Sequence, residues 1–279
     1  MPILDAQEPS PAPEPSPSKR VPIFLRLFHT GINDHNLSGT RAPRIITRFL
    51  WSRPEIYRIY LRRRHGTNLF NPDLQLVIDG FPRSGNSYSG RMIGLSQGEN
   101  FKFLSQCHCP PFLLAALKMG TPAALTLRQP EDSAVSWVIL RKLPMDVVLK
   151  LYIDFHRVLL RQRKKLLVLN FKTITGDFSL VLRMMNRRFG LKLDVPENIH
   201  ATKEEAFSHI DSYYQQQPGG YDPMKVARPH PERDQMKEQV RQQLKSPQNA
   251  RIVAEALKLY EAFDFEGRQE LAKLSGPVA

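Results

Sequence analysis

The stretch LQLVIDGFPRSGNSYSGRMIGL, residues 74–95, decides the fold. It opens on the apolar run 74–79, which has the length of a buried strand, and passes through a turn between Gly80 and Gly85 into a helical pattern. A strand, a glycine-rich loop and a helix form the setting of a phosphate-binding loop, where backbone N–H groups and the helix N-terminus face an anion. The stretch therefore predicts an anion site over 80–87. The plainer alternative is a tight connection with Arg83 at the surface.

The loop departs at one position from the pattern that binds nucleoside triphosphates. Residues 80–87 fit GxxxxGK[ST], except that Asn86 stands where a lysine normally reaches the β- and γ-phosphates. This difference disfavours an ordinary ATPase or kinase. Arg83 supplies a cation earlier in the loop, where it can meet a group attached to a 5′-phosphate. A ligand with no γ-phosphate and no obligatory magnesium suits this loop better than ATP does.

Short apolar runs alternate with helical stretches after residue 74, which is typical of βαβ units and a parallel sheet. We expect buried strands at 74–79, 123–127 and 166–170, and a weaker one at 101–105. We expect helices at 85–95, 110–119, 130–142, 145–164, 177–189, 231–245 and 247–263. The predicted fold class is α/β: a three-layer α/β/α domain over 74–279, with a central, mostly parallel sheet of the P-loop nucleotide-binding type.

The composition narrows the partners and the compartment. Among 279 residues, Lys and Arg number 40 against 27 Asp and Glu, and the net charge of +13 favours anionic partners such as phosphates, nucleic acid, acidic glycans or lipid headgroups. Cys107 and Cys109 are the only cysteines, too close in sequence to bridge each other, so we expect no disulfide framework and a reducing compartment. The sequence has no apolar run of membrane-spanning length and no signal-like start, which predicts a cytoplasmic protein.

The first 73 residues differ from the rest of the chain. Residues 1–20 are rich in Pro, Ser and Glu, which predicts a disordered tail, and 21–73 form a basic, helical N-terminal segment. Within it, 41–65 interleave arginines with large apolar side chains at near-helical spacing. Such a helix can lie on an anionic membrane as a peripheral contact, or line an acceptor site. The alternative is a helix that caps the domain and keeps its arginines in solvent.

A second candidate anion site lies at the end of the strand predicted at 123–127. Arg128 follows that strand, and Ser136 comes eight residues later on the next predicted helix. A guanidinium offers a planar pair of donors to phosphate, and a hydroxyl on the neighbouring helix adds another. Taken alone, the two residues also fit a surface arginine and a serine near a helix N-terminus.

In combination, the loop and the Arg128–Ser136 pair resemble the sulfotransferase superfamily, whose enzymes use 3′-phosphoadenosine-5′-phosphosulfate (PAPS). FPRSGNS is similar to its 5′-phosphosulfate loop, although many members carry two hydroxyl residues where this chain has Asn86 and Ser87. The resemblance spans about 74–263 and is strongest over 77–137. It implies that the 3′-phosphate is held by Arg128 and Ser136, and the 5′-phosphosulfate by Arg83, Ser84, Gly85, Asn86 and Ser87.

The same resemblance suggests a catalytic base. Cys107-His108-Cys109-Pro110 is similar to the Thr-His-Leu-Pro segment that presents the catalytic histidine in cytosolic members. Imidazole is well suited to take a proton from an acceptor near neutral pH, so His108 is the candidate base, while Arg83 would stabilise charge on the leaving phosphate. No metal is required. The alternative is a structural histidine at a junction between a loop and a helix.

Two parts of the family pattern are missing. Phe171-Lys172 stands where members often have Tyr-Glu, so we interpret 166–193 as scaffold. The Arg-Lys-Gly segment that helps hold the 3′-phosphate in cytosolic members has no match, and Arg228 is the nearest basic candidate.

The predicted function is transfer of a sulfuryl group from PAPS to a hydroxyl or amine acceptor, with a glycan or lipid-linked sugar as candidate acceptors. We expect no nucleic-acid partner. One rival hypothesis is a magnesium-dependent nucleotide or small-molecule kinase, against which Asn86 argues. Another is a non-catalytic basic protein with a phosphate-binding loop, in which His108 would be dispensable.

Overall fold

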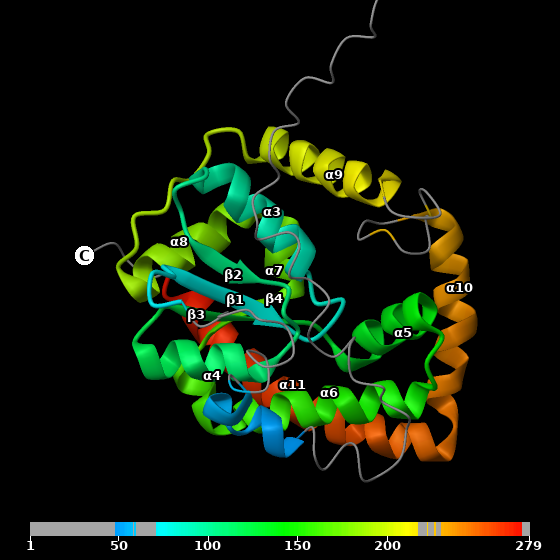
Figure 1. Cartoon of the computed structure of the whole chain (residues 1–279). Helices are drawn as coiled ribbons and strands as arrows, with labels where there is room; N and C mark the ends of the chain where they lie inside the picture. The colour runs from blue at the N-terminus through cyan, green and yellow to red at the C-terminus, as the bar shows by residue number, and fades with distance from the viewer. Residues whose placement is uncertain are drawn as a thin grey trace, which may run out of the picture.

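A parallel four-stranded sheet forms the centre of the protein. The computed structural model describes residues 48–57, 59, 71–216, 222, 226 and 230–274. The strands β1 (Leu76–Gly80), β2 (Phe103–Ser105), β3 (Ala123–Leu127) and β4 (Leu167–Asn170) lie in the order β2-β1-β3-β4, and all pairs are parallel. This confirms the predicted strands and the predicted parallel sheet, including the weak candidate that became β2 (Figure 1).

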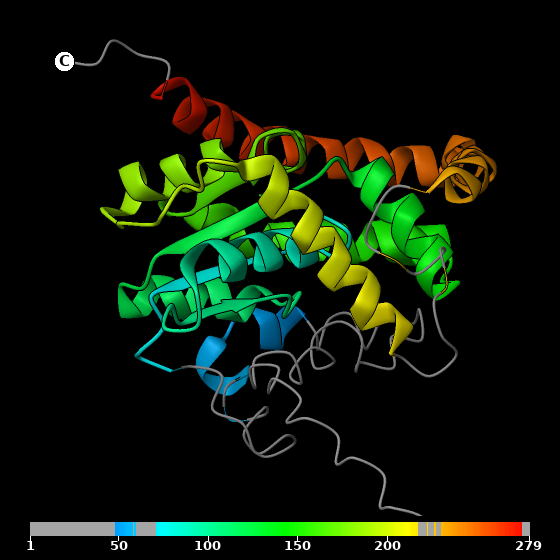
Figure 2. The same cartoon turned by 90° about the horizontal axis from the view of Figure 1, so that it is seen from above.

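Alternate side chains of each strand enter two different apolar clusters, one on either face of the sheet. Leu76, Ile78 and Leu169 belong to one cluster, whereas Val77 and Val168 belong to the other. A parallel sheet that is covered on both faces buries all of its side chains, which explains why the strands are nearly continuous apolar runs. The two clusters establish helices on both faces and support the predicted α/β class (Figures 1 and 2).

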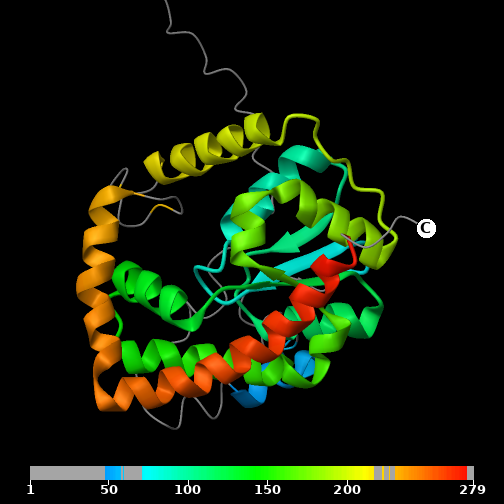
Figure 3. The ribbon, with the colours of Figure 1, turned by 180° about the vertical axis from the view of Figure 1, so that it is seen from behind.

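The helices divide between these two clusters. One face is covered by α3 (Asn86–Gln97), α7 (Phe171–Gly176), α8 (Phe178–Phe189) and α9 (Ile199–Gln215). The other is covered by α4 (Pro110–Met119), α5 (Pro130–Arg141), α6 (Met145–Leu159) and α11 (Pro247–Ala272). The 3₁₀ turn η2 (Leu160–Lys165) follows α6, and α10 (Pro231–Arg241) and η3 (Gln242–Lys245) precede α11. Figure 3 shows α11 running alongside α6 and β4, which it contacts.

The boundaries of several predicted helices need correction. The helix expected at 145–164 ends at Leu159 and continues as η2, while the helix expected at 231–245 changes to η3 after Arg241. The last helix is longer than expected and reaches Ala272. The sequence analysis missed α9 altogether, because only Ala206 and Ile210 of its residues are buried and it therefore lacks a continuous apolar stripe.

The strand order creates a topological switch point between β1 and β3. The chain leaves β1 through α3 on one face and leaves β3 through α5 on the other. At such a point the connections diverge and open a crevice beyond the carboxyl ends of the two strands, where open α/β sheets bind their ligands. Gly80 ends β1 so close to β3 that an added Cβ would lie 2.1 Å from Thr126 Oγ1. The end of β1 therefore packs directly against Thr126, with no room for a side chain at position 80.

The described part of the N-terminal segment packs on the domain. We call residues 48–57 and 59 the N-terminal arm. The side chains of Trp51 and Tyr57 are fully buried, with ring centroids 6.2 Å from Phe155 and 6.1 Å from Phe112 respectively. This packing agrees with the domain-capping interpretation of 41–65, of which 41–47, 58 and 60–65 lie outside the described residues, as does the predicted tail at 1–20. Among the described helices, none has the length and hydropathy needed to cross a bilayer.

Candidate anion-binding site

The loop between β1 and α3 has the backbone geometry of an anion-binding turn. Arg83 and Gly85 have φ angles of 68° and 95°, both in the left-handed region that glycine adopts most easily. Gly85 is the N-cap of α3 and leaves the first N–H groups of that helix without intrahelical acceptors. Phe81 fixes the loop from below, with its ring centroid 5.1 Å from Trp137 and 5.0 Å from Tyr152. The helix N-terminus is therefore held in place to face an anion.

Asn86 is the centre of a buried hydrogen-bond network under the loop. Its Nδ2 lies 3.1 Å from the carbonyl oxygens of both Gly80 and Phe81, and its Oδ1 accepts a 2.6 Å bond from Thr126 Oγ1. The amide that replaces the lysine of the triphosphate pattern therefore ties the loop to the ends of β1 and β3. Among the atoms of Asn86, the backbone N–H remains available for an anion.

The two serines of the loop have different surroundings. Ser84 is fully buried, and its hydroxyl has no hydrogen-bond partner within the described part of the chain. Ser87 donates to Gln106 Oε1 at 3.0 Å. Buried hydroxyls are normally paired, so the Ser84 hydroxyl is a donor for which a ligand would supply the acceptor.

Three arginines meet at the switch point. Arg83 Nε donates to Ser136 Oγ at 2.9 Å, and Arg128 Nη1 donates to the Arg83 carbonyl oxygen at 3.0 Å. Arg233, at the start of α10, has only 5% of its side chain exposed, and both it and Arg83 donate to the carbonyl oxygen of Val226. The structure thus brings together three of the predicted site residues, Arg83, Arg128 and Ser136, and adds Arg233. We call Arg83, Arg128 and Arg233 the arginine cluster.

The charges of the arginine cluster repel one another. Burial lowers the pKa of Arg83 to about 10, and the neighbouring positive charges of Arg233 and Arg128 contribute to this decrease. The pKa of Arg128 is also lowered, mainly by burial and further by Arg233, against the opposing effect of Asp132. Asp132 in turn accepts a 2.8 Å bond from Arg241. A bound anion would relieve this repulsion, because it favours the charged forms of all three guanidiniums.

Two further buried donors belong to Arg128 and to Ser133 near the start of α5. Arg128 Nε and the Ser133 hydroxyl are buried and have no hydrogen-bond partner among the residues that the structure describes. Arg128 is held from other directions, since Tyr152 donates to its carbonyl oxygen at 2.8 Å and its guanidinium carbon lies 4.1 Å from the centroid of the Phe171 ring. The guanidinium is therefore fixed in position while one of its donors remains available.

His108 lies on the other side of the loop, on a segment held by a buried carboxylate. Asp79, at 1% exposure, accepts the backbone N–H groups of His108 and Cys109, each at 3.0 Å. Burial raises the pKa of Asp79, while the neighbouring His108 ring and these hydrogen bonds act in the opposite direction. The segment is also tied to the arm, because the thiol of Cys109 contacts the Tyr57 hydroxyl at 2.9 Å.

The hydrogen bonds of the His108 ring define its tautomer. Nδ1 lies 3.0 Å from the Gly80 carbonyl oxygen and 3.1 Å from Asn86 Nδ2. The two hydrogens of the Asn86 amide are already directed at the carbonyl oxygens of Gly80 and Phe81. We therefore assign the proton of the imidazole to Nδ1, which donates to Gly80. This leaves the lone pair of Nε2 available to accept a proton.

Several of these residues were not among the predicted site residues, and one predicted residue is not described. Arg228 lies outside the described residues. Asp79 could have been identified from the sequence, because an aspartate inside an otherwise apolar strand is buried and must accept hydrogen bonds from nearby donors. Phe171 lies in the stretch 166–193 that the sequence analysis interpreted as scaffold, although its ring contacts the Arg128 guanidinium. Arg233 had no local signal, because it is far along the chain and reaches the site only through the placement of α10.

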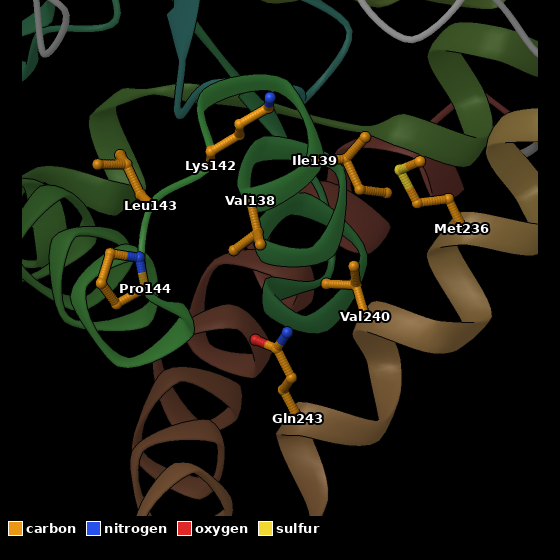
Figure 4. Close-up of a pocket in the computed structure, with 8 residues that line it drawn as sticks. All are labelled: Val138, Ile139, Lys142, Leu143, Pro144, Met236, Val240 and Gln243. Atoms are coloured by element: carbon orange, nitrogen blue, oxygen red, sulfur yellow. The ribbon is translucent and has the colours of Figure 1, made fainter.

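The cavity shown in Figure 4 is separate from this site. It has a volume of about 460 Å³ and lies between the later turns of α5 and α10, with a wall of Val138, Ile139, Lys142, Leu143, Pro144, Met236, Val240 and Gln243. None of the arginines of the cluster contributes to that wall.

Comparisons of the chain with protein-family models, with curated proteins and with solved structures find no match.

Proposed function

We propose that this protein is a PAPS-dependent sulfotransferase whose donor site lies at the switch point between β1 and β3. The observation that carries the proposal is the arginine cluster, together with the buried donors Arg128 Nε, Ser84 Oγ and Ser133 Oγ, which have no partner within the described chain. Buried guanidiniums and donors that lack an acceptor favour a ligand with more than one anionic group. PAPS carries a 3′-phosphate and a 5′-phosphosulfate, which matches an anion site with two adjoining parts.

The proposal assigns the two parts of the site to opposite ends of the nucleotide. The loop residues 83–87 and the first N–H groups of α3 would hold the 5′-phosphosulfate, and Arg128 and Ser136 the 3′-phosphate. Because Arg83 bonds directly to Ser136, it must exchange that bond for one to the nucleotide when the donor binds. Arg233 would supply the cation that the missing Arg-Lys-Gly segment provides in cytosolic members. Asn86 would contribute only its backbone N–H, because its side chain is engaged beneath the loop.

The chemistry follows from the tautomer of His108 and the position of the cations. His108 Nε2 would take the proton of the acceptor hydroxyl while the acceptor oxygen forms its bond to sulfur. The bond from sulfur to the phosphate oxygen breaks, and its electron pair stays on the leaving 3′,5′-adenosine bisphosphate. Arg83 and the N-terminus of α3 would stabilise this developing negative charge. Asp79 would keep the His108 segment in place, since it accepts two of the backbone N–H groups of that segment.

Calorimetry with three nucleotides tests the donor site. We expect 3′,5′-adenosine bisphosphate to bind more tightly than 5′-AMP, and ATP with magnesium to bind weakly. Arg128→Ala should weaken binding of the bisphosphate by about 50-fold, because a charge-assisted bond to phosphate contributes about 2–3 kcal/mol. The same variant should bind 5′-AMP nearly as well as the wild type does.

Arg183→Ala is the matched control, because it removes an exposed arginine from α8, far along the chain from the site. It should leave all three affinities unchanged. Tight binding of ATP with magnesium and indifference to the 3′-phosphate would instead favour a kinase. His108→Ala should bind the bisphosphate normally and lose transfer from radiolabelled PAPS, whereas full transfer by this variant would remove His108 from the chemistry.

A further inference from the structure

A groove on the far side of α4 has no role in the proposed donor site. It lies between the N-terminal arm, α4 and the segment from the end of α6 through η2, and its volume is about 520 Å³. The arm is the blue segment beside α4 in Figures 1 and 2. The groove has apolar surface from Pro54, Leu114, Leu117 and Val158. We call it the arm groove.

The rim of the arm groove is strongly basic. Four cations and one carboxylate line it: Arg53, Lys118, Arg161, Lys165 and Glu55. The single carboxylate is already paired, because Glu55 bonds Lys118 across the groove. Arg161 and Lys165 have no ion pair within the described ranges, and both side chains are exposed. The rim therefore presents uncompensated positive charge above an apolar floor.

Exposed apolar side chains gather in the same part of the molecule. In the described chain, six large hydrophobic side chains are exposed by between 38% and 56%: Phe49, Ile56, Ile59, Met119, Met236 and Phe265. The first three belong to the arm, and Met119 directly follows Lys118 of the groove rim. Ile56 likewise follows Glu55 of the rim. Four of these six side chains thus belong to the arm or to the end of α4, two of the elements that line the groove.

We propose that the arm groove is a docking site for a membrane surface that carries anionic phospholipids. Interfacial helices bind such surfaces by combining apolar side chains, which enter the boundary between headgroups and acyl chains, with Lys and Arg that attract the anionic headgroups. The arm and the groove rim supply both. A soluble acidic partner would satisfy the cations but would leave the isoleucines of the arm in water. This docking site does not depend on the proposed donor site, since the two share no residues.

Vesicle flotation tests the proposal with the full-length chain. We expect binding to vesicles of phosphatidylcholine mixed with phosphatidylserine, and little binding to phosphatidylcholine alone. Arg161→Ala/Lys165→Ala should lower the affinity by about 30-fold, because each basic residue near an anionic surface contributes roughly fivefold. Ile56→Ser/Ile59→Ser should also lower the affinity, and the binding that remains should fall more steeply with added salt.

Arg183→Ala/Arg187→Ala on α8 is the matched control, because it removes the same charge from exposed positions elsewhere. It should bind the mixed vesicles like the wild type. An equal loss in this control would show that only the net charge matters, and would overturn the arm groove as the docking site. Unchanged vesicle binding by the Arg161→Ala/Lys165→Ala variant, or no binding by the wild-type chain, would also overturn it. Bisphosphate affinity, measured in parallel, should be the same in every variant.

Discussion

The Asn86 network and the arginine cluster lie on either side of the same loop and differ in how completely their polar atoms are paired. Beneath the loop, the side-chain amide of Asn86 bonds Gly80, Phe81 and Thr126, with His108 Nδ1 at its edge. In the arginine cluster, burial and neighbouring guanidinium charges lower the pKa values of Arg83 and Arg128, and the Arg128 Nε has no partner within the described chain.

This difference separates scaffold from binding surface. A buried polar network whose atoms are all paired is stable as it is and fixes a single backbone conformation. Like charges held together at a crevice cost free energy until a ligand of the opposite charge binds. The two regions should therefore respond differently to substitution: stability should suffer in the first, and affinity for the nucleotide in the second.

The largest expected effect is on stability and comes from the Asn86 network. Asn86→Leu conserves side-chain size but removes one donor from each of two buried carbonyl oxygens and leaves the Thr126 hydroxyl without a partner. We expect the free energy of unfolding to fall by about 4 kcal/mol, since the unpaired hydroxyl costs about 1–3 kcal/mol and each of the two other lost hydrogen bonds about 1 kcal/mol. Urea denaturation measures the change. Ser87→Ala at the next position is the control and should cost far less, and a similarly small cost for Asn86→Leu would contradict the scaffold role.

An effect of intermediate size is expected from His156, which packs under the loop with its ring centroid 6.3 Å from Phe81. Burial lowers the pKa of His156 to about 4. The unfolded chain takes up a proton at this histidine below about pH 6.5, which the folded chain does not, so stability should be lost as the pH falls from 6.5 towards 4. The loss attributable to His156 should be on the order of 3 kcal/mol.

His156→Phe keeps an aromatic ring and removes the titration. The pH dependence of its unfolding free energy between pH 6.5 and 4 should be flatter than that of the wild type. Parallel curves for the two proteins would show that His156 becomes protonated in the folded state as readily as in the unfolded chain.

The smallest expected effect is at Phe171, which connects the two regions because its ring lies against both Gly85 and Arg128. An alanine Cβ at Gly85 would be 3.4 Å from this ring, and the Arg128 guanidinium carbon lies 4.1 Å from its centroid. Phe171→Leu should keep the apolar contact and lose the cation–π interaction, which weakens bisphosphate binding by about fivefold. Phe101→Leu, which alters a stacked phenylalanine pair beside β2, should have no effect on the same titration.

Local patterns predicted the sheet and part of the site for identifiable reasons. The strand at 123–127 was predicted with its observed bounds because a short apolar run between turn residues is a strong local signal. Arg83 and Arg128 were assigned to one ligand because of the resemblance to sulfotransferases, and they lie close together because both follow parallel strands, whose carboxyl ends share one edge of the sheet. Arg233 was missed because its position depends on how α10 packs against α5. The sequence analysis also missed that the Asn86 side chain hydrogen-bonds the loop to β1 and β3. A sequence motif shows which residue occupies a position, but it does not show which way the side chain of that residue points.

The contact between Tyr57 and Cys109 has a practical consequence for anyone shortening this chain. A fragment that starts just before β1 would retain the whole sheet, yet it would remove the aromatic cover of Phe112 and the hydroxyl that meets the Cys109 thiol. The backbone N–H groups of Cys109 and His108 both donate to the carboxylate of Asp79. A shift of Cys109 would therefore also displace His108, the candidate base. Such a fragment could fold and still be inactive, and fragments intended for activity measurements should begin upstream of the arm.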